Sequence, residues 1–152
     1  MSYSLPPVAI ALGRRALDIA CAALPNRVSR GVTRVAESEV VQMALGEAAA
    51  AIDVATMLLH TGREASTAAV SSGRRINEAE ALRARRDMVY AQHQVSWALD
   101  RLCELDGARW VYDEDELGSI RRDMMTVLTH TAASRVAGLA PYGRMLLSDG
   151  DA

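Results

Sequence analysis

The apolar residues of this chain recur every three or four positions along four long segments, which is the spacing of one buried face on an α-helix. The segments cover residues 7–24, 37–64, 77–104 and 116–140. Alanine is abundant and only 4% of the residues are aromatic, so the chain lacks the β-branched and aromatic runs that strands favour. This pattern predicts an all-α protein in which four helices with short connections form an up-down bundle.

The ends of these segments carry residues that commonly start or stop helices. Pro7 suits a first helical turn, Gly107 suits the residue after a helix, and Asp115 suits a helix N-terminus. The Ser-rich residues 66–73 indicate a break after the second segment, and Pro141 indicates the end of the fourth. The second segment has the broadest apolar surface, so we expect it to be largely buried.

Length, charge and cysteine content limit the classes of protein to which the chain can belong. A chain of 152 residues, half of them apolar, fits one globular domain, residues 1–152. A net charge of −2 gives no general attraction for nucleic acid or an anionic membrane, and Asp18 interrupts the first apolar segment. No basic segment precedes it, so no signal peptide is expected. Cys21 and Cys103 form no redox or metal motif, so we expect buried thiols in a reducing cytoplasm.

Motifs for metals and phosphates are missing from the sequence. Bundle proteins often bind metals through Glu-x-x-His, but no glutamate lies three residues before any of the three histidines. We therefore expect no metal, and there is no Gly-rich phosphate loop either. A basic loop with Arg27, Arg30 and Arg34 could hold a phosphate or simply be solvated. His60 and His93 have no evident partner.

The stretch GARWVYDEDELGSIRRDMMTVLTH holds the candidate site residues. His130 lies seven residues after Asp123, and two helical turns would place both on one face. There a histidine could transfer a proton or bind a reactive oxygen, although a lone helix histidine more often bonds a carbonyl or faces solvent. Trp110 and Tyr112 could stack on a flat ligand or cap the core. Arg122 could hold an anion or pair with a carboxylate.

The order of the segments resembles the C-terminal helical domain of the acyl-CoA dehydrogenase superfamily over almost the whole chain. LPPVAIALGRRALDIACAAL is similar to the family's first bundle helix, and ALDRLCELDGA resembles the end of its third. The spacing from Gly107 through Tyr112 and Arg122 to His130 resembles the branch of flavin-dependent monooxygenases. That branch includes two-component enzymes that take reduced flavin from a separate reductase.

The resemblance also implies roles for residues. Dehydrogenases of the family carry a tyrosine and then a glutamate base where this chain has His130 and Thr131, and a threonine cannot replace a carboxylate base. The monooxygenase branch often has a histidine near the flavin or substrate, and the resemblance places His130 at that position. His130 would then serve in proton transfer or oxygen activation. Trp110, Tyr112 and Arg122 would shape the flavin end of the site.

Three functions follow as hypotheses. The first is a C-terminal bundle domain or subunit of a flavin-dependent oxidoreductase, monooxygenase-like and not active alone. Family members have an N-terminal helical domain and a β-domain before the bundle, so FAD or FMN would bind only when another chain supplies them. The second is a non-catalytic dimeric binding or assembly protein that kept only the fold, with its apolar second helix in the contact. The third is a small-molecule binder with a pocket between helices.

Overall fold

The structure is a computed structural model that describes residues 5–28 and 34–148. Within these ranges the chain forms helices and no β-strand, which confirms the all-α prediction. The α-helices are α1 (Leu5–Ala23), α2 (Glu39–Ser71), α3 (Glu78–Asp106), α4 (Glu116–Thr129) and α5 (Arg135–Ser148). Short 3-10 turns lie between them, at Leu24–Asn26, Val35–Glu37, Gly107–Val111 and Thr131–Ala133.

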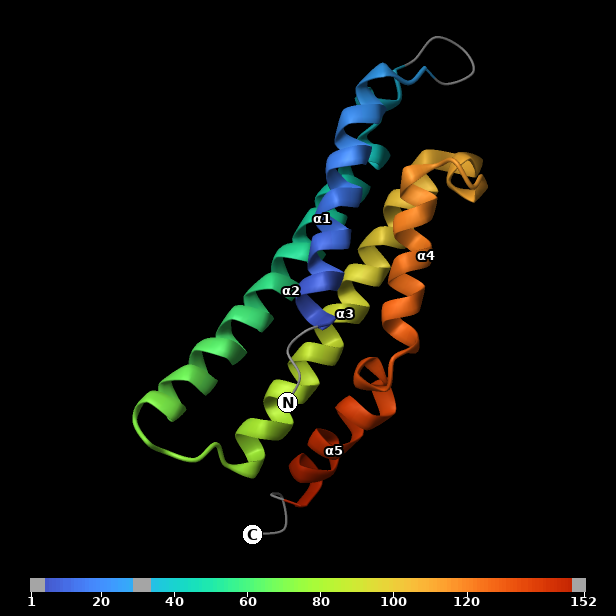
Figure 1. The fold of residues 1–152 in the computed structure, drawn as a ribbon. Helices are drawn as coiled ribbons and strands as arrows, with labels where there is room; N and C mark the ends of the chain where they lie inside the picture. Colours follow the sequence, from blue (N-terminus) through green and yellow to red (C-terminus); the bar gives the residue numbers. More distant parts are fainter. Residues whose placement is uncertain (1–4, 29–33, 149–152) are drawn as a thin grey trace.

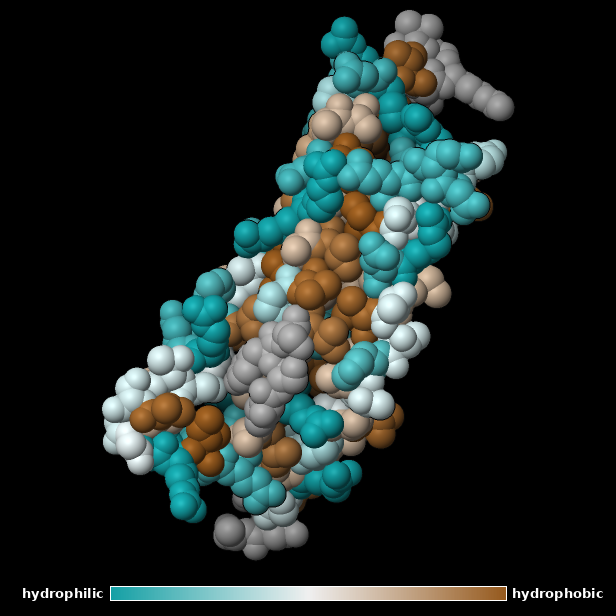
Figure 2. Space-filling model, viewed as in Figure 1, coloured by the Kyte–Doolittle hydropathy of each residue, from teal (hydrophilic) through white to brown (hydrophobic). Residues whose placement is uncertain are grey.

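The helices form an up-down bundle in which two short helices share the fourth position. In Figure 1, α1, α2 and α3 alternate in direction, and α4 and α5 follow one another along α3. α3 is the central element, because it packs against all four of the other helices. On the face seen in Figure 2, apolar residues gather along the middle of the molecule and polar residues lie toward its edges.

Most buried residues of α1 and α2 are alanines, with Ile10 and Ile52 as larger exceptions, whereas α3 supplies several larger buried side chains. Ala16 and Ala48 are fully buried, as are Val95, Leu99 and Leu102 of α3. Small side chains let helices approach closely, so the larger residues of α3 fill the space between them.

The Ser-rich segment, expected to interrupt the chain from residue 66, instead continues α2 to Ser71. The Ser66 hydroxyl donates to the carbonyl oxygen of Gly62 at 2.8 Å, so this serine bonds within the helix rather than ending it. Gly73 follows the end of the helix, and its φ of 69° is in the left-handed region. The Arg74 N–H then bonds the Ala69 carbonyl at 2.9 Å, as in a glycine-terminated helix.

The fourth predicted helix, residues 116–140, is also wrong as a single element. α4 ends at Thr129, and α5 begins at Arg135 and contains Pro141. Short polar groups satisfy the backbone at the break, because the Ser134 hydroxyl accepts the Ala137 N–H at 3.3 Å. Because of the break, residues 130–134 form a turn that lies beside the middle of α3.

The outer side of α2 corrects the expectation that this helix is largely buried. Val40, Met43, Val54 and Met57 are exposed as two pairs with the exposed Glu47 and Ala50 between them, and only 28% of the most apolar window of α2 is buried. By length and composition alone, α2 is also apolar enough to cross a membrane. The bundle therefore leaves one apolar helix face uncovered.

Candidate functional site at the α4–α5 turn

Two histidines hold the turn between α4 and α5. Nδ1 of His130 accepts the Ala132 N–H at 3.1 Å, which caps the turn from within. From α3, Nε2 of His93 lies 3.1 Å from the Ala133 carbonyl oxygen. A carbonyl only accepts, so His93 donates this bond. His93, which had no evident partner in the sequence, thus fixes the turn against α3.

The hydrogen bond to His130 also decides where the proton of its neutral ring lies. Because Nδ1 accepts, the ring carries its hydrogen on Nε2. His130 is exposed, so this N–H is free to donate to an oxygen atom of a ligand or of another chain. The local fold therefore presents one oriented donor at the surface of the turn.

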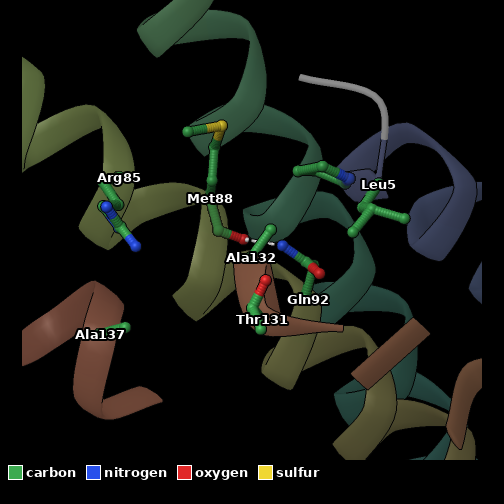
Figure 3. Close-up of a pocket in the computed structure, with 8 residues that line it drawn as sticks. Leu5, Arg85, Met88, Gln92, Thr131, Ala132 and Ala137 are labelled. Atoms are coloured by element: carbon green, nitrogen blue, oxygen red, sulfur yellow. Dashed lines mark hydrogen bonds between the residues drawn. The ribbon is translucent and has the colours of Figure 1, made fainter. Parts of the chain in front are cut away.

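A pocket of about 310 Å³ lies beside this turn, and we call it the α4–α5 pocket. It is partly open to solvent and is bounded by the start of α1, the first half of α3, the turn and α5 (Figure 3). Its lining residues are Leu5, Pro6, Arg85, Met88, Gln92, Thr131, Ala132 and Ala137. The volume is at the lower end of the range for small-molecule sites, and most of the lining is apolar.

The polar groups of the pocket come mainly from α3. Gln92 is 1% exposed, and its Nε2 donates to the Met88 carbonyl at 3.0 Å. Its Oε1 has no hydrogen-bond partner among the described residues. Figure 3 shows the carboxamide between Ala132 and Leu5, with the nitrogen toward Met88. The exposed Arg85 also has no ion-pair partner in the described part of the chain.

Sequence reasoning missed Gln92, although a signal was present. The apolar positions Met88, Val95 and Leu99 share one helical face, and Gln92 falls on that same face. A glutamine on a buried stripe is uncommon enough to mark a candidate site.

The other predicted site residues lie at the opposite end of α4. Trp110 is half-buried and packs on the core, whereas Tyr112 is 66% exposed. Arg122 donates to the Asp113 carbonyl at 3.4 Å and lies 3.9 Å from its carboxylate. From Gly118, which packs on Trp110, to His130 is about 18 Å along the helix axis at 1.5 Å per residue. The structure therefore does not bring His130 together with the other three.

The basic loop supplies a structural contact at that end. Arg27 donates to the Leu105 carbonyl at 2.9 Å and to the Asp106 carboxylate at 3.0 Å, so it closes the C-terminus of α3. Burial raises the pKa of Asp106, and the nearby Arg27 opposes that rise. Arg34 is exposed, and Arg30 lies outside the described residues. Arg27 is thus already paired rather than free for a phosphate.

The cysteines differ from each other, and neither is in a disulfide. Cys103 is buried as expected, and burial together with the charge of Asp100 raises its pKa to about 12. Cys21 is exposed, which corrects the expectation for that residue. In the described ranges no group of three or more histidine, cysteine, aspartate or glutamate residues could hold a metal ion.

Comparison with known proteins identifies the family to which this chain belongs. The family model described as acyl-CoA dehydrogenase, C-terminal domain, matches residues 4–135. Among solved structures, XiaF from Streptomyces sp. in complex with FADH2 and glycerol is 26% identical with a TM-score of 0.89. The match covers 95% of this chain and 37% of XiaF. A search of curated proteins finds no match.

Two further structures share the fold at lower identity. The 3-HSA hydroxylase from Rhodococcus sp. RHA1 is 22% identical, and the HsaA monooxygenase from M. tuberculosis is 24% identical. Both give a TM-score of 0.84, and each match covers 95% of this chain and 36% of the other. The chain therefore spans little more than a third of the length of the proteins it resembles.

Proposed function

Since the chain belongs to the family of the acyl-CoA dehydrogenase C-terminal domain, we propose that it is the bundle domain or subunit of a flavin-dependent, monooxygenase-like oxidoreductase. The likeness to XiaF, whose structure holds FADH2, supports a flavin as the cofactor. The observation that carries the proposal is the α4–α5 turn, where the oriented donor of His130 immediately precedes Thr131 and Ala132, two residues that line a ligand-sized pocket.

The residues present fit part of a flavin site. A pocket of about 310 Å³ is large enough for one ring system and too small for a whole dinucleotide. We therefore propose that another chain with an N-terminal helical domain and a β-domain completes the site, and that FAD or FMN binds only there. The redox chemistry would then come from the bound flavin, while this chain orients the reacting molecule.

Within that site we assign a proton role to His130. Its Nε2–H would donate to an oxygen atom at the mouth of the pocket. The neighbouring Thr131 offers a hydroxyl and no carboxylate, so α-proton abstraction from an acyl-CoA is not the proposed reaction. Trp110, Tyr112 and Arg122 lie at the far end of α4, where only a ligand as extended as a dinucleotide would also reach them.

The second candidate is a non-catalytic dimer or assembly protein. The exposed apolar residues Val40, Met43, Val54 and Met57 on α2 favour it, because exposed apolar patches often mark a contact with a partner. Either candidate is proposed to work in the cytoplasm, and the free, exposed thiol of Cys21 supports a reducing compartment. Nucleic acid and membranes are not proposed as partners.

The test is to isolate the tagged protein from its native host and record an intact-complex mass spectrum. A heteromeric complex with flavin and a chain carrying the two other domains supports the first candidate. His130→Ala should then lower its activity strongly, because the Nε2 donor is gone. A homodimer with neither flavin nor a second chain would contradict the first candidate and favour the second.

A further inference from the structure

We infer that the α4–α5 pocket binds a small, largely apolar molecule that donates a hydrogen bond, from a hydroxyl or a neutral N–H, to Oε1 of Gln92. The inference rests on the proposed function for the identity of the site, and it adds the class of molecule that the site accepts. All of the contacts that carry it lie within this chain.

The orientation of the Gln92 carboxamide is fixed by its own helix. The Met88 carbonyl can only accept a hydrogen bond, so the amide nitrogen must be the atom that faces it at 3.0 Å. Turning the group over would bring two oxygen atoms together. Oε1 is therefore held on the side of the carboxamide away from Met88, and it is left without a partner among the described residues.

A buried amide oxygen without a partner is costly, because it has lost water and gained nothing in return. Three other buried side-chain atoms in the described ranges also lack partners, but they differ from Oε1. Each belongs to a charged group that is already paired through its other atoms: Arg101 with Glu104, Asp106 with Arg27, and Arg121 with Asp100. Gln92 is uncharged and almost wholly buried, and it lines a pocket.

The remaining lining decides the charge of the ligand. None of the described residues that line the pocket is acidic, and Arg85 contributes a positive charge without an ion-pair partner. An ammonium group would therefore meet repulsion and find no counter-charge. A neutral hydroxyl or N–H satisfies Oε1 without that cost, and Leu5, Met88 and Ala137 suit an apolar body.

A water molecule is the main competitor for Oε1. Buried waters usually need two to four polar partners, and besides the exposed Arg85 the pocket offers only Oε1 and the Thr131 hydroxyl on a mostly apolar surface. Such a water would be weakly held, so a ligand that replaces its hydrogen bond and also buries apolar surface should displace it.

The inference is tested by titrating the full chain with phenol and with anisole while following backbone amide shifts by NMR. The two probes match in shape, and only phenol can donate. We expect phenol to bind about fivefold more tightly, because it gains one hydrogen bond, and to shift the amides of residues 85–92 and 130–137. Indole against 1-methylindole repeats the comparison for an N–H donor. Equal binding within both pairs would overturn the inference, and this comparison requires no variant.

Variants then assign the preference to one atom. In Gln92→Met the affinity for phenol should fall to that for anisole, because the side chain keeps its length and loses Oε1. Gln94→Met is the matched control, since Gln94 lies on α3 and lines a different pocket, between α3 and α5. An unchanged preference in Gln92→Met, or a lost one in Gln94→Met, would contradict the assignment.

These measurements use no flavin and no second chain. If neither phenol nor indole binds, the inference is overturned, and the mass spectrum of the isolated complex still decides the proposed function. If the chain binds donors selectively but forms no complex with flavin, the inference holds and the proposed function fails.

Discussion

The two connections on either side of α4 are held together in different ways. At the α3–α4 connection, polar groups pair mainly with one another: Arg27 closes the end of α3, and the Asp115 carboxylate accepts the Gly118 N–H at 2.9 Å. At the α4–α5 turn, histidines satisfy the backbone, but Gln92 Oε1 and Arg85 are left without partners in the described ranges.

This difference indicates that the α3–α4 connection stabilises the fold, whereas the α4–α5 turn borders a binding site. Where polar groups satisfy each other, a substitution should be felt mainly in stability. Where a buried group is left unsatisfied, removing it should stabilise the protein and cost only ligand binding. The four predictions below test this contrast, from the largest expected effect to the smallest.

The largest effect is expected for Gly118→Ala at the α3–α4 connection. An added Cβ would meet the Trp110 carbonyl oxygen well inside contact distance, and backbone atoms there cannot move aside easily. We expect the free energy of unfolding to fall by about 3 kcal/mol in urea titrations. Gly46→Ala in α2 is the control, because nothing lies within 4 Å of its Cβ, and it should gain about 0.5–1 kcal/mol. If the two variants changed the free energy of unfolding by a similar amount, the close packing of Gly118 on Trp110 would be contradicted.

Arg27→Ala should cost about 2 kcal/mol, because it removes charge-assisted bonds to Asp106 and leaves that carboxyl without its cation. The buried Cys103 reports the opening of this end, since its thiol should be alkylated far more slowly than Cys21 at pH 8. In the variant Cys103 should react faster. Arg15→Ala, which breaks an exposed ion pair with Glu116, should change neither measurement by much.

Gln92→Met should raise the free energy of unfolding by about 1 kcal/mol. It removes an unsatisfied oxygen, which costs about 1–3 kcal/mol, and loses one bond worth about 0.5–1.5 kcal/mol. Thermal melts of this variant and of Gln94→Met would measure the difference. A loss of 1 kcal/mol or more in Gln92→Met would show that Gln92 serves the fold, and the contrast between the two connections would fail.

The smallest effect on the free energy of unfolding is expected for His130→Ala. The variant removes the acceptor for the Ala132 N–H, so it should lower this free energy by about 0.5–1 kcal/mol. His130→Asn keeps an acceptor and should remain within about 0.3 kcal/mol of the native protein. Both variants lack the Nε2–H. If the complete assembly loses activity equally in the two, the loss belongs to the donor and not to the turn.

Much of the fold could be predicted from local signals in the sequence. Gly107 has a φ of 70° at the end of α3, and Asp115 caps α4, as both residue types indicated. The resemblance to the acyl-CoA dehydrogenase C-terminal domain is confirmed as well. Signals of this kind act within one helical turn, so they can be read without knowing the tertiary structure.

The break after α4 and the pocket could not be predicted in the same way. No glycine or proline marks residues 130–134, whereas Pro141 suggested a helix end and instead lies inside α5. The pocket forms because Leu5 at the start of α1 meets Gln92 and Ala132, which are distant in sequence. Such a meeting depends on how the helices pack, and periodicity within one helix carries no information about it.

The weak anchoring of α5 has a consequence for how a ligand enters the pocket. Only Gly138 and Tyr142 of α5 are buried, whereas α4 buries five residues. An element with so little buried surface detaches at a lower free energy than the rest of the bundle, so its amides should exchange with solvent through local opening. Ala137 of α5 forms one wall of the pocket. A bound ligand should therefore slow hydrogen exchange along all of α5, although it would touch that helix at a single residue.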